Sequence, residues 1–425
     1  MNRYDNAKIF FLAEKIIILL PVALLFSNLI SEFLIIILSI IFIIKIDRKQ
    51  ISKIISNKIF ICLFVIIIYF FINYILNLNK DPDIKRSLFF FRFPLYVISL
   101  SFFLSSEFIN KKKIFLYWGV ILLIICIDLQ FQNIFGKNIF GYNAVLQGDV
   151  VRLGGFLNDE TKIAYFINNL FSVFLGSLIF YKNKSKNLLI YLILSTLFVV
   201  YTVYLTGERS NFISLLIFIF IFFLINNFKN FIFFTFISVM TILVLNVSDL
   251  KESSKFKRMI TQNIQIIKST LISDNERGFL YKDNQYFSHY STAIEMYKEY
   301  PVLGVGLKNF RNYCNKQSYK KNIYPSWKNN SCSTHPHNPY FEILSELGTL
   351  GFVVFFGSFL IIFYLFIKEY IKNKNPLLFA NTIILMTYFV PFLPKGSFFT
   401  NWNAIIFWTI FAINCHLLKS KSYNL

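Results

Sequence analysis

The sequence predicts an all-α polytopic membrane protein with about twelve membrane-spanning helices. Two observations support this fold class. Of the 425 residues, 56% are hydrophobic and 15% are charged, with a mean hydropathy of +0.57, whereas soluble domains carry about 25% charged residues. Apolar runs of about 18 or more residues also recur along the chain, and runs of this length cross the hydrocarbon core as helices. Because lipid offers no partner for an open strand edge, helices are the expected solution.

The expected helices divide the chain into three segments. Residues 1–247 contain helices one to nine, residues 248–340 form a long outer loop with amphipathic helices, and residues 341–425 contain helices ten to twelve. The apolar runs that define the twelve helices lie near residues 9–29, 31–45, 59–77, 87–105, 114–130, 161–181, 188–206, 210–226, 230–247, 341–367, 377–394 and 401–418.

The formal net charge of +21 indicates either an anionic partner, such as nucleic acid, or a membrane topology. Short cytoplasmic loops of membrane proteins collect Lys and Arg. With the N-terminus inside, the inner segments hold 19 basic and 4 acidic residues, so both termini are expected in the cytoplasm. A nucleic-acid site would gather charge on one soluble face, and we expect no nucleic-acid partner. The inner basic residues are Arg3, Lys8, Lys45, Arg48, Lys49, Lys53, Lys58, Lys111, Lys112, Lys113, Lys182, Lys184, Lys186, Lys229, Lys368, Lys372, Lys374, Lys419 and Lys421.

Two predicted outer loops, residues 131–160 and 248–340, exceed the usual length of a connection and indicate function. In the longer loop, apolar residues recur at helical spacing from Phe256 to Leu271, which is typical of an amphipathic helix on a membrane surface. A second short helix is expected from Ser291 to Glu299, because Pro301 cannot continue it.

Cys314 and Cys332 share this long loop. In an oxidising periplasm they could form a disulfide, but sequence does not fix the separation of their Cα atoms, so the pairing stays open. Zinc is disfavoured, because the chain has no C-x-x-C motif and His335 and His337 are the nearby imidazoles. We therefore expect no metal.

The segment from Thr334 to Tyr340 is the first candidate for chemistry. It places His335, His337 and Asn338 directly before the tenth predicted helix. An imidazole exchanges a proton near neutral pH, which suits the activation of a hydroxyl. Upstream, Gly304 and Gly306 are spaced for a tight turn or a close backbone approach.

Arginines near the predicted outer surface form the second candidate group. Arg209 lies in a very short turn between two long apolar helices, and Arg92 lies near the outer end of helix four. Arg152 begins a polar stretch of the shorter outer loop. An arginine at membrane depth is costly without a partner, and its planar fork binds phosphate bidentately. Each arginine could be a structural ion-pair partner, but together they suit a polyanionic lipid head group.

The arrangement resembles the bacterial O-antigen ligase and polymerase superfamily. His337-Asn338, nine residues, Gly348, two residues and Gly351 is similar to the O-antigen ligase motif. The other similar stretches are Pro301-Val302-Leu303-Gly304-Val305-Gly306 with Phe310, the small-x-Arg-Ser turn Gly207-Glu208-Arg209-Ser210, and Arg152 to Asn158 with Gly154, Gly155 and Phe156. The resemblance covers roughly residues 140–360 and the twelve-helix plan.

The resemblance implies glycosyl transfer at the periplasmic face of the bacterial inner membrane, by an enzyme of the metal-independent membrane glycosyltransferase type (C-type) without a cofactor. The donor would be a glycan on undecaprenyl diphosphate. A ligase passes this glycan to a sugar hydroxyl of lipid A-core, whereas a polymerase passes the growing chain to the next lipid-linked repeat unit. Membrane lipids would surround the enzyme.

The resemblance also implies roles for individual residues. Arg209 would bind and stabilise the departing diphosphate, and His337 would orient or deprotonate the acceptor hydroxyl. Asn338 and Glu346 would support His337, and Arg152 and Arg92 could contact substrate. Family members carry a further arginine where this chain reads Gln285-Tyr286-Phe287-Ser288-His289-Tyr290. His289, Arg277 or Arg311 could replace it, and this departure slightly favours a polymerase or an unusual ligase.

The competing class is a transporter of lipid-linked sugars. Transporters show repeats and broken helices at the bilayer midplane. This sequence shows no half-to-half repeat and collects its polar motifs at one predicted face, which favours an enzyme.

Overall fold

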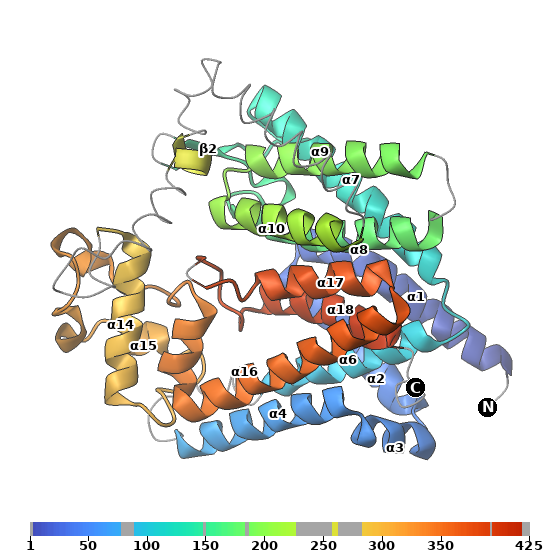
Figure 1. Cartoon of the computed structure of the whole chain (residues 1–425), viewed down its shortest axis with the longest axis horizontal. Coiled ribbons are helices and arrows are strands. Elements are labelled where there is room, and N and C mark those ends of the chain that lie inside the picture. The colour runs from blue at the N-terminus through green and yellow to red at the C-terminus, as the bar shows by residue number, and fades with distance from the viewer. Residues whose placement is uncertain are drawn as a thin grey trace. The chain divides into compact units, whose positions relative to one another are not determined.

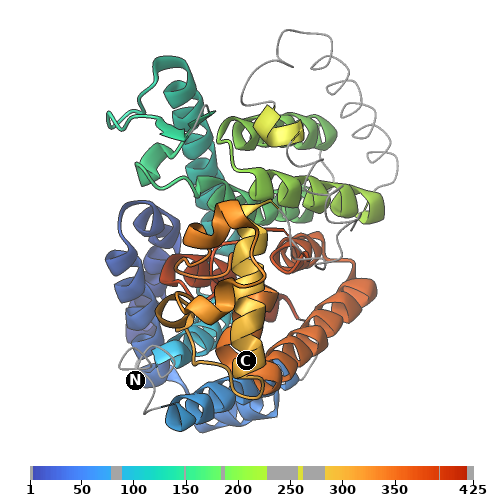
Figure 2. The ribbon, with the colours of Figure 1, turned by 90° about the vertical axis from the view of Figure 1, so that its left-hand side faces the viewer.

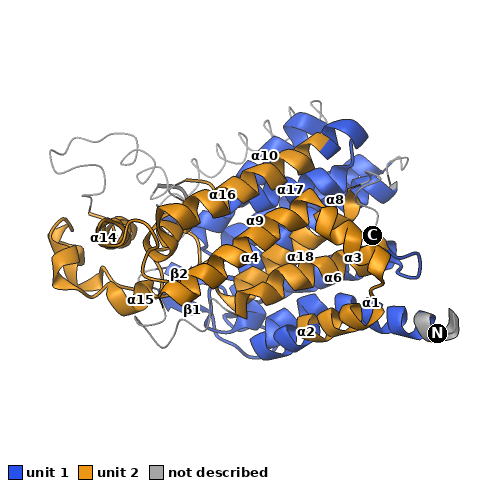
Figure 3. Cartoon of the chain, turned by 90° about the horizontal axis from the view of Figure 1, so that it is seen from below, with its two compact units in different colours: residues 1–34, 106–268, 369–388 blue, residues 35–105, 269–368, 389–425 orange. Residues whose placement is uncertain are grey.

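The computed structural model describes residues 3–77, 89–147, 150–182, 187–226, 257–261, 283–391 and 393–418. The chain forms two compact units, each assembled from three stretches of sequence (Figure 3). Unit 1 comprises residues 1–34, 106–268 and 369–388, and unit 2 comprises residues 35–105, 269–368 and 389–425.

Unit 1 is a helical bundle with one small hairpin. Helix α8 packs against α7, α9 and α17, and α10 packs against α17. The antiparallel hairpin pairs Val145 with Arg152. The elements of unit 1 are α1 (Arg3–Phe26), the start of α2 (Asn28–Lys45), α7 (Lys111–Phe135), β1 (Val145–Gln147), β2 (Val150–Arg152), η3 (Gly155–Leu157), α8 (Ile163–Lys182), α9 (Leu188–Leu205), α10 (Arg209–Asn226), η5 (Lys257–Thr261) and α17 (Pro376–Thr387).

Unit 2 contains the remaining elements, and Figure 1 labels its α-helices. Helix α18 packs against α6, and α14 packs against the short turns η6 and η7, as the gold helix and its orange neighbours in Figure 2 show. The elements of unit 2 are most of α2, α3 (Arg48–Ser56), α4 (Lys58–Leu76), η2 (Phe89–Phe91), α6 (Arg92–Ser105), α14 (Gln285–Glu299), α15 (Phe310–Tyr313), η6 (Gln317–Lys320), η7 (Pro325–Asn330), α16 (Pro339–Asn373, of which residues 369–373 belong to unit 1) and α18 (Asn401–Leu417).

Eight described helices are long and apolar enough to cross a membrane, which agrees with an all-α polytopic membrane protein. They fall on eight of the twelve predicted spans. Two further predicted spans correspond to shorter apolar helices, Phe89–Ser105 and Pro376–Thr387, and the last corresponds to α18 with 17 residues. The span predicted at 230–247 lies outside the described residues. The total of twelve therefore stays a prediction, as does the placement of both termini in the cytoplasm.

The described part of the long loop, residues 257–261 and 283–340, contains more short helices than the two that were predicted. The helix expected from Ser291 begins six residues earlier, where Asn284 accepts a hydrogen bond from the Tyr286 N–H at 2.9 Å, and it ends at Glu299 before Pro301. Of the amphipathic segment 256–271, the structure describes residues 257–261, which form a π-helical turn. The rest of that segment lies outside the described residues.

Helix α16 is kinked at Gly348, where the backbone takes φ 67° and ψ −169°. In a straight helix, the N–H groups of Thr349 and Leu350 donate to the carbonyls four residues earlier, those of Ser345 and Glu346. Here Thr349 N–H donates to the Pro301 carbonyl at 2.8 Å, and Leu350 N–H donates to the Val302 carbonyl at 3.3 Å. Backbone N–H groups at such a break would have no hydrogen-bond partner in lipid. Here the carbonyls of residues 301 and 302 accept hydrogen bonds from them.

The same turn also donates to the kink. Val305 N–H donates to the Ser345 carbonyl at 3.1 Å, and Gly306 N–H donates to the Glu346 carbonyl at 2.8 Å. Two helical hydrogen bonds are thus replaced by four bonds between residues that are 40 or 48 positions apart. We call this contact the glycine interlock, formed by residues 301–306 and 345–350.

Glycine is required where the two backbones meet. A Cβ atom on Gly304 would lie 2.3 Å from the Glu346 carbonyl carbon, and one on Gly348 would lie 2.3 Å from the Val302 oxygen. Both residues also have positive φ, which side chains disfavour. Gly351 lets the Tyr69 ring approach, and the Tyr69 hydroxyl donates to the Leu347 carbonyl at 2.5 Å. Helix α4 is thereby fixed to the kink.

We predict that Gly348→Ala lowers the free energy of unfolding by about 3 kcal/mol, because the variant combines left-handed strain with a backbone clash. The measurement is the unfolding midpoint of the purified protein in detergent. Gly357→Ala is the matched control on the same helix, since a Cβ atom there meets nothing within 4 Å. Equal midpoints for Gly348→Ala and wild type would show that the interlock is not needed.

Candidate functional site

The predicted site residues fall into two groups, one in each unit. Arg152 and Arg209 lie in unit 1, and the remaining described ones lie in unit 2. Arg277 lies outside the described residues. The unit 2 residues are Arg92, His289, Arg311, His337, Asn338, Glu346 and the four glycines Gly304, Gly306, Gly348 and Gly351.

Three of the chain's four histidines form one cluster in unit 2. The His337 ring centre lies 4.1 Å from that of His335 and 5.3 Å from that of His289. The Tyr286 ring meets His337 edge-on at 5.6 Å. His337 has a φ of 59°, which is unusual for a residue with a side chain, and its carbonyl accepts from the Lys395 N–H at 2.7 Å. The hydrogen bond from Lys395 thus helps to hold the His337 backbone in a strained conformation.

Burial keeps the three imidazoles neutral. It lowers the pKa of His335 to about 3, with added repulsion from His337, His289 and Arg311. Burial and repulsion from His289 lower the pKa of His337 to about 4. The pKa of His289 is also lowered by burial. At neutral pH each ring therefore has one unprotonated nitrogen that can accept a hydrogen bond.

The proton of His289 can be assigned from its partner. Its Nδ1 lies 3.0 Å from the Ser331 carbonyl, and a carbonyl oxygen only accepts, so Nδ1 carries the proton. The next residue, Cys332, forms a disulfide with Cys314 across 5.1 Å between Cα atoms. Cys314 is fully buried in a cluster with Met296, Val305 and Phe310. The disulfide therefore fixes the loop segment whose carbonyl orients His289.

Two basic residues act electrostatically on the start of α16, and one of them also acts on the histidine cluster. The charges of Arg311 and Lys308 both act on the Glu342 carboxyl, and that of Arg311 acts on His335. The Arg311 Nε atom is buried and has no hydrogen-bond partner among the described residues. Arg311 is therefore the arginine that the structure brings to the histidines in unit 2.

The two glutamates at the start of α16 are fully buried and bind backbone. The Glu346 carboxylate accepts from the Lys308 N–H at 2.7 Å and from the Phe310 N–H at 3.2 Å. Glu342 accepts from the Ser397 hydroxyl and from the Phe398 N–H. The Glu346 side chain thus holds the segment directly after the interlock turn, and Glu342 holds the segment before α18. The predicted role of Glu346 in substrate binding stays a prediction.

Asn338 and Arg92 also make structural contacts. The Asn338 Oδ1 atom accepts from the Tyr340 N–H at 2.9 Å and so caps α16. The Arg92 guanidinium donates to the Phe89 carbonyl at 2.7 Å and to the Asn401 side chain at 2.9 Å, and it lies 4.4 Å from the centre of the Phe93 ring. Arg92 therefore links the start of α6 to the start of α18.

In unit 1, the turn between α9 and α10 collects three arginines. Gly207 has a φ of 72°, and a Cβ atom there would lie 3.3 Å from the Arg152 side chain. Arg258 donates from Nε to the Gly207 carbonyl at 3.2 Å, and Arg209 begins α10. The sequence did not distinguish Arg258 from the other basic residues of the predicted amphipathic segment. The turn that Arg258 contacts lies 51 residues away, so no local pattern predicts the contact.

Hydrogen bonds fix the turn through Glu208 and fix the side chain of Arg152. The Glu208 carboxylate accepts from the Ala164 N–H at 2.7 Å, at the start of α8, and from the Asn211 amide at 2.6 Å. Arg152 donates to the Gln147 side chain at 2.7 Å and to the Thr161 carbonyl at 2.8 Å. The turn is therefore a rigid, positively charged end of the α9–α10 hairpin, of the kind that binds phosphate.

Together these features define a polytopic membrane protein with a neutral histidine cluster in one unit and an arginine-rich turn in the other. Residues 190–356 match a family model described as O-Antigen ligase, and no curated protein shows a significant match to the chain. The match includes the arginine turn, the glycine interlock and the histidine cluster. It confirms the resemblance seen in the motifs and supports assignment to the O-antigen ligase and polymerase superfamily.

We predict that lowering the pH from 7 to 4 destabilises the long loop. In the unfolded chain the pKa of histidine is about 6.5, whereas burial lowers that of His337 to about 4 in the folded chain. The unfolded state therefore binds protons first, and stability present above pH 6.5 is lost as the pH falls toward 4. Hydrogen exchange of the Lys395 amide, measured against pH, tests this.

The control is the double variant His335→Gln with His337→Gln, which should flatten this pH dependence, whereas His416→Gln should leave it unchanged. If the exchange of the Lys395 amide in the double variant depended on pH as it does in the wild type, His335 and His337 would not be the source of the pH dependence.

Proposed function

We propose that this protein transfers a glycan from undecaprenyl diphosphate to a sugar hydroxyl at the periplasmic face of the bacterial inner membrane, as an O-antigen ligase acting on lipid A-core. The family match supports ligase- or polymerase-type activity in general. The observation that carries the proposal is the neutral, strained His337 within the matched range.

In the proposed reaction, the acceptor oxygen bonds to the anomeric carbon as the bond from that carbon to the diphosphate breaks. The hydroxyl proton passes to an unprotonated nitrogen of His337. Because its pKa is only about 4, His337 first accepts a hydrogen bond from the hydroxyl and takes the proton late, as bond formation makes that proton acidic. The reaction uses neither a metal nor a nucleotide sugar in this proposal.

The departing diphosphate gains negative charge, which fixed cations stabilise. Arg209 would bind it directly, with Arg152 and Arg258 completing the positively charged turn. Arg311 is our candidate for the arginine that the stretch from Gln285 to Tyr290 lacks, because its charge reaches His335. His289 is the less suitable candidate, since burial lowers its pKa and keeps it neutral.

A polymerase is the second candidate, because the sequence departs from the ligase pattern at residues 285–290. Deleting the gene and analysing the surface glycan separates the two. A ligase deletion leaves lipid-linked polymer and bare core, whereas a polymerase deletion leaves single repeat units attached to core. Wild-type glycan in the deletion strain would exclude both, and accumulation of donor on the cytoplasmic side would indicate a transporter.

We predict that His337→Ala and Arg209→Ala each lower transfer at least about 100-fold, which is the usual effect of losing a general base or a charge-stabilising group. Transfer is measured with purified enzyme, lipid-linked donor and acceptor. His416→Ala and Arg48→Ala are the matched controls and should keep wild-type transfer. Wild-type rates for His337→Ala at equal protein level would remove the catalytic assignment.

A further inference from the structure

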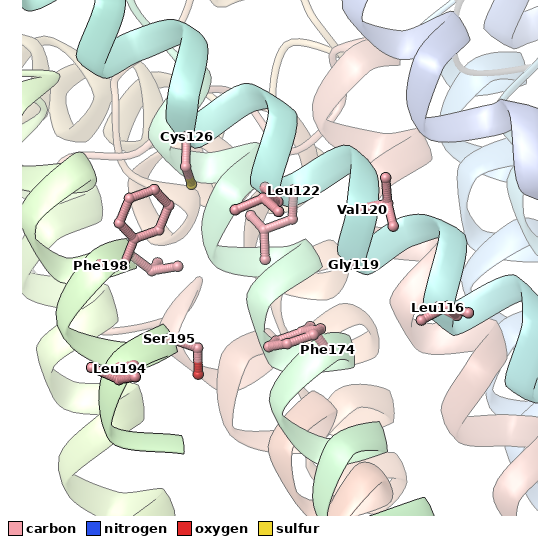
Figure 4. A pocket seen from close by; sticks show the side chains of 11 residues that line it. Leu116, Gly119, Val120, Leu122, Cys126, Phe174, Leu194, Ser195 and Phe198 are labelled. Carbon is pink, nitrogen blue, oxygen red and sulfur yellow. The ribbon is translucent and has the colours of Figure 1, made fainter. Parts of the chain in front are cut away.

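An apolar groove in unit 1 has no part in the proposed chemistry. It lies among α7, α8 and α9, which pack against one another pairwise, and its volume is about 510 Å³. This volume falls within the range of small-molecule sites. Figure 4 shows residues of α7 facing Phe174 of α8 and Ser195 and Phe198 of α9. Ser195 is the one polar residue in the lining, and its hydroxyl donates to the Leu192 carbonyl at 3.2 Å. The lining therefore offers a ligand no free polar group.

Two small residues, Gly119 and Ser195, lie among Leu, Val and Phe residues in the lining. A Cβ atom on Gly119 would lie 2.7 Å from the Phe174 ring, so Gly119 lets the ring of α8 lie against α7. Ser195 is the smallest lining residue on α9. The shape of the groove is thus set by residues of three helices.

The floor of the groove is buried and its rim is exposed. Cys126 and Val199 are 0% and 2% exposed, whereas Leu116 and Leu194 on the rim are 66% and 60% exposed. Both rim helices, α7 and α9, are long and apolar enough to cross a membrane. The open side would then meet lipid tails, and a groove of this composition fits a hydrocarbon chain.

The polar end of the groove indicates which kind of head group the bound hydrocarbon chain would carry. One turn beyond Cys126 and Val199, the Gln130 amide donates to the Thr202 hydroxyl at 3.2 Å and joins α7 to α9. From Val199 to the end of α9 at Leu205 the axis rises roughly 9 Å, and the arginine turn with Arg209 follows. Apolar groove, polar bridge and cationic turn thus lie in order along one helix.

We propose that the groove binds one hydrocarbon chain of an anionic membrane lipid, whose head group lies toward the arginine turn. Burial of apolar surface holds the hydrocarbon chain in the groove. Only the head-group end of the inference rests on the proposed function, because the groove itself does not involve His337.

The test uses the full-length protein, delipidated in detergent and incubated with undecaprenyl monophosphate or with phosphatidylglycerol. Native mass spectrometry counts the lipids retained per chain. Ser195→Phe, which fills the groove, should reduce retention at least about tenfold. Leu197→Phe is the control, since Leu197 lies on the same helix, is 38% exposed and does not line the groove.

Each outcome decides the proposal. Groove-dependent retention of undecaprenyl monophosphate alone identifies a polyprenyl chain, and that of phosphatidylglycerol alone identifies a fatty acyl chain. Groove-dependent retention of both supports a general hydrocarbon site. Equal retention by Ser195→Phe and wild type, or none by wild type, overturns the proposal.

A measurement on the wild-type protein covers the case in which Ser195→Phe does not fold. Phosphatidylglycerol and undecaprenyl monophosphate, each carrying a diazirine in the chain, should form photoadducts with α7 and α9 residues of the groove, and adducts only elsewhere would overturn the proposal. His337→Ala should lose transfer but retain lipid, so failure of the proposed function and failure of this inference are distinguishable.

Discussion

The site in unit 2 depends on the glycine interlock, in which the kinked backbone of α16 exchanges its own hydrogen bonds for bonds to residues 301–306. A kink alone would leave N–H and C=O groups without partners, at a cost of several kcal/mol in an apolar environment. The turn satisfies four such groups, and it approaches closely enough because Gly304 and Gly348 have no side chain. The two glycines are therefore one structural feature, although 43 positions separate them.

The residues proposed for chemistry are positioned by this interlock. Directly after the turn, Glu346 binds the backbone N–H groups of Lys308 and Phe310, which places Arg311. Directly before the kinked helix, Asn338 caps α16 and His337 takes its left-handed conformation. The disulfide holds the segment that orients His289. The half-buried base His337 and the half-buried cation Arg311 are thus positioned by backbone contacts, so that the proposed site is organised before substrate binds.

The sequence predicted much of the fold, because long apolar runs have few alternatives in a membrane. It also predicted α14, whose end Pro301 determines, and a tight turn at Gly304 and Gly306. It did not predict the kink, since nothing local shows that Gly348 meets Val302. Nor did it predict the hydrogen bonds from Arg258 to the Gly207 carbonyl and from Ser397 to Glu342. Contacts between distant segments produce no periodic pattern in the sequence. The β1–β2 hairpin is too short to show alternation.

The central claim is that Arg209 binds the departing diphosphate and His337 takes the acceptor proton in one transfer reaction. The direct test is the single-turnover transfer rate of the purified wild type, Arg209→Ala, His337→Ala and the double variant, each at equal protein level. The account predicts a loss of at least about 100-fold in each single variant. It also predicts that the double variant loses far less than the product of the two single losses, because residues that act together are not additive. Wild-type transfer by either single variant would contradict it.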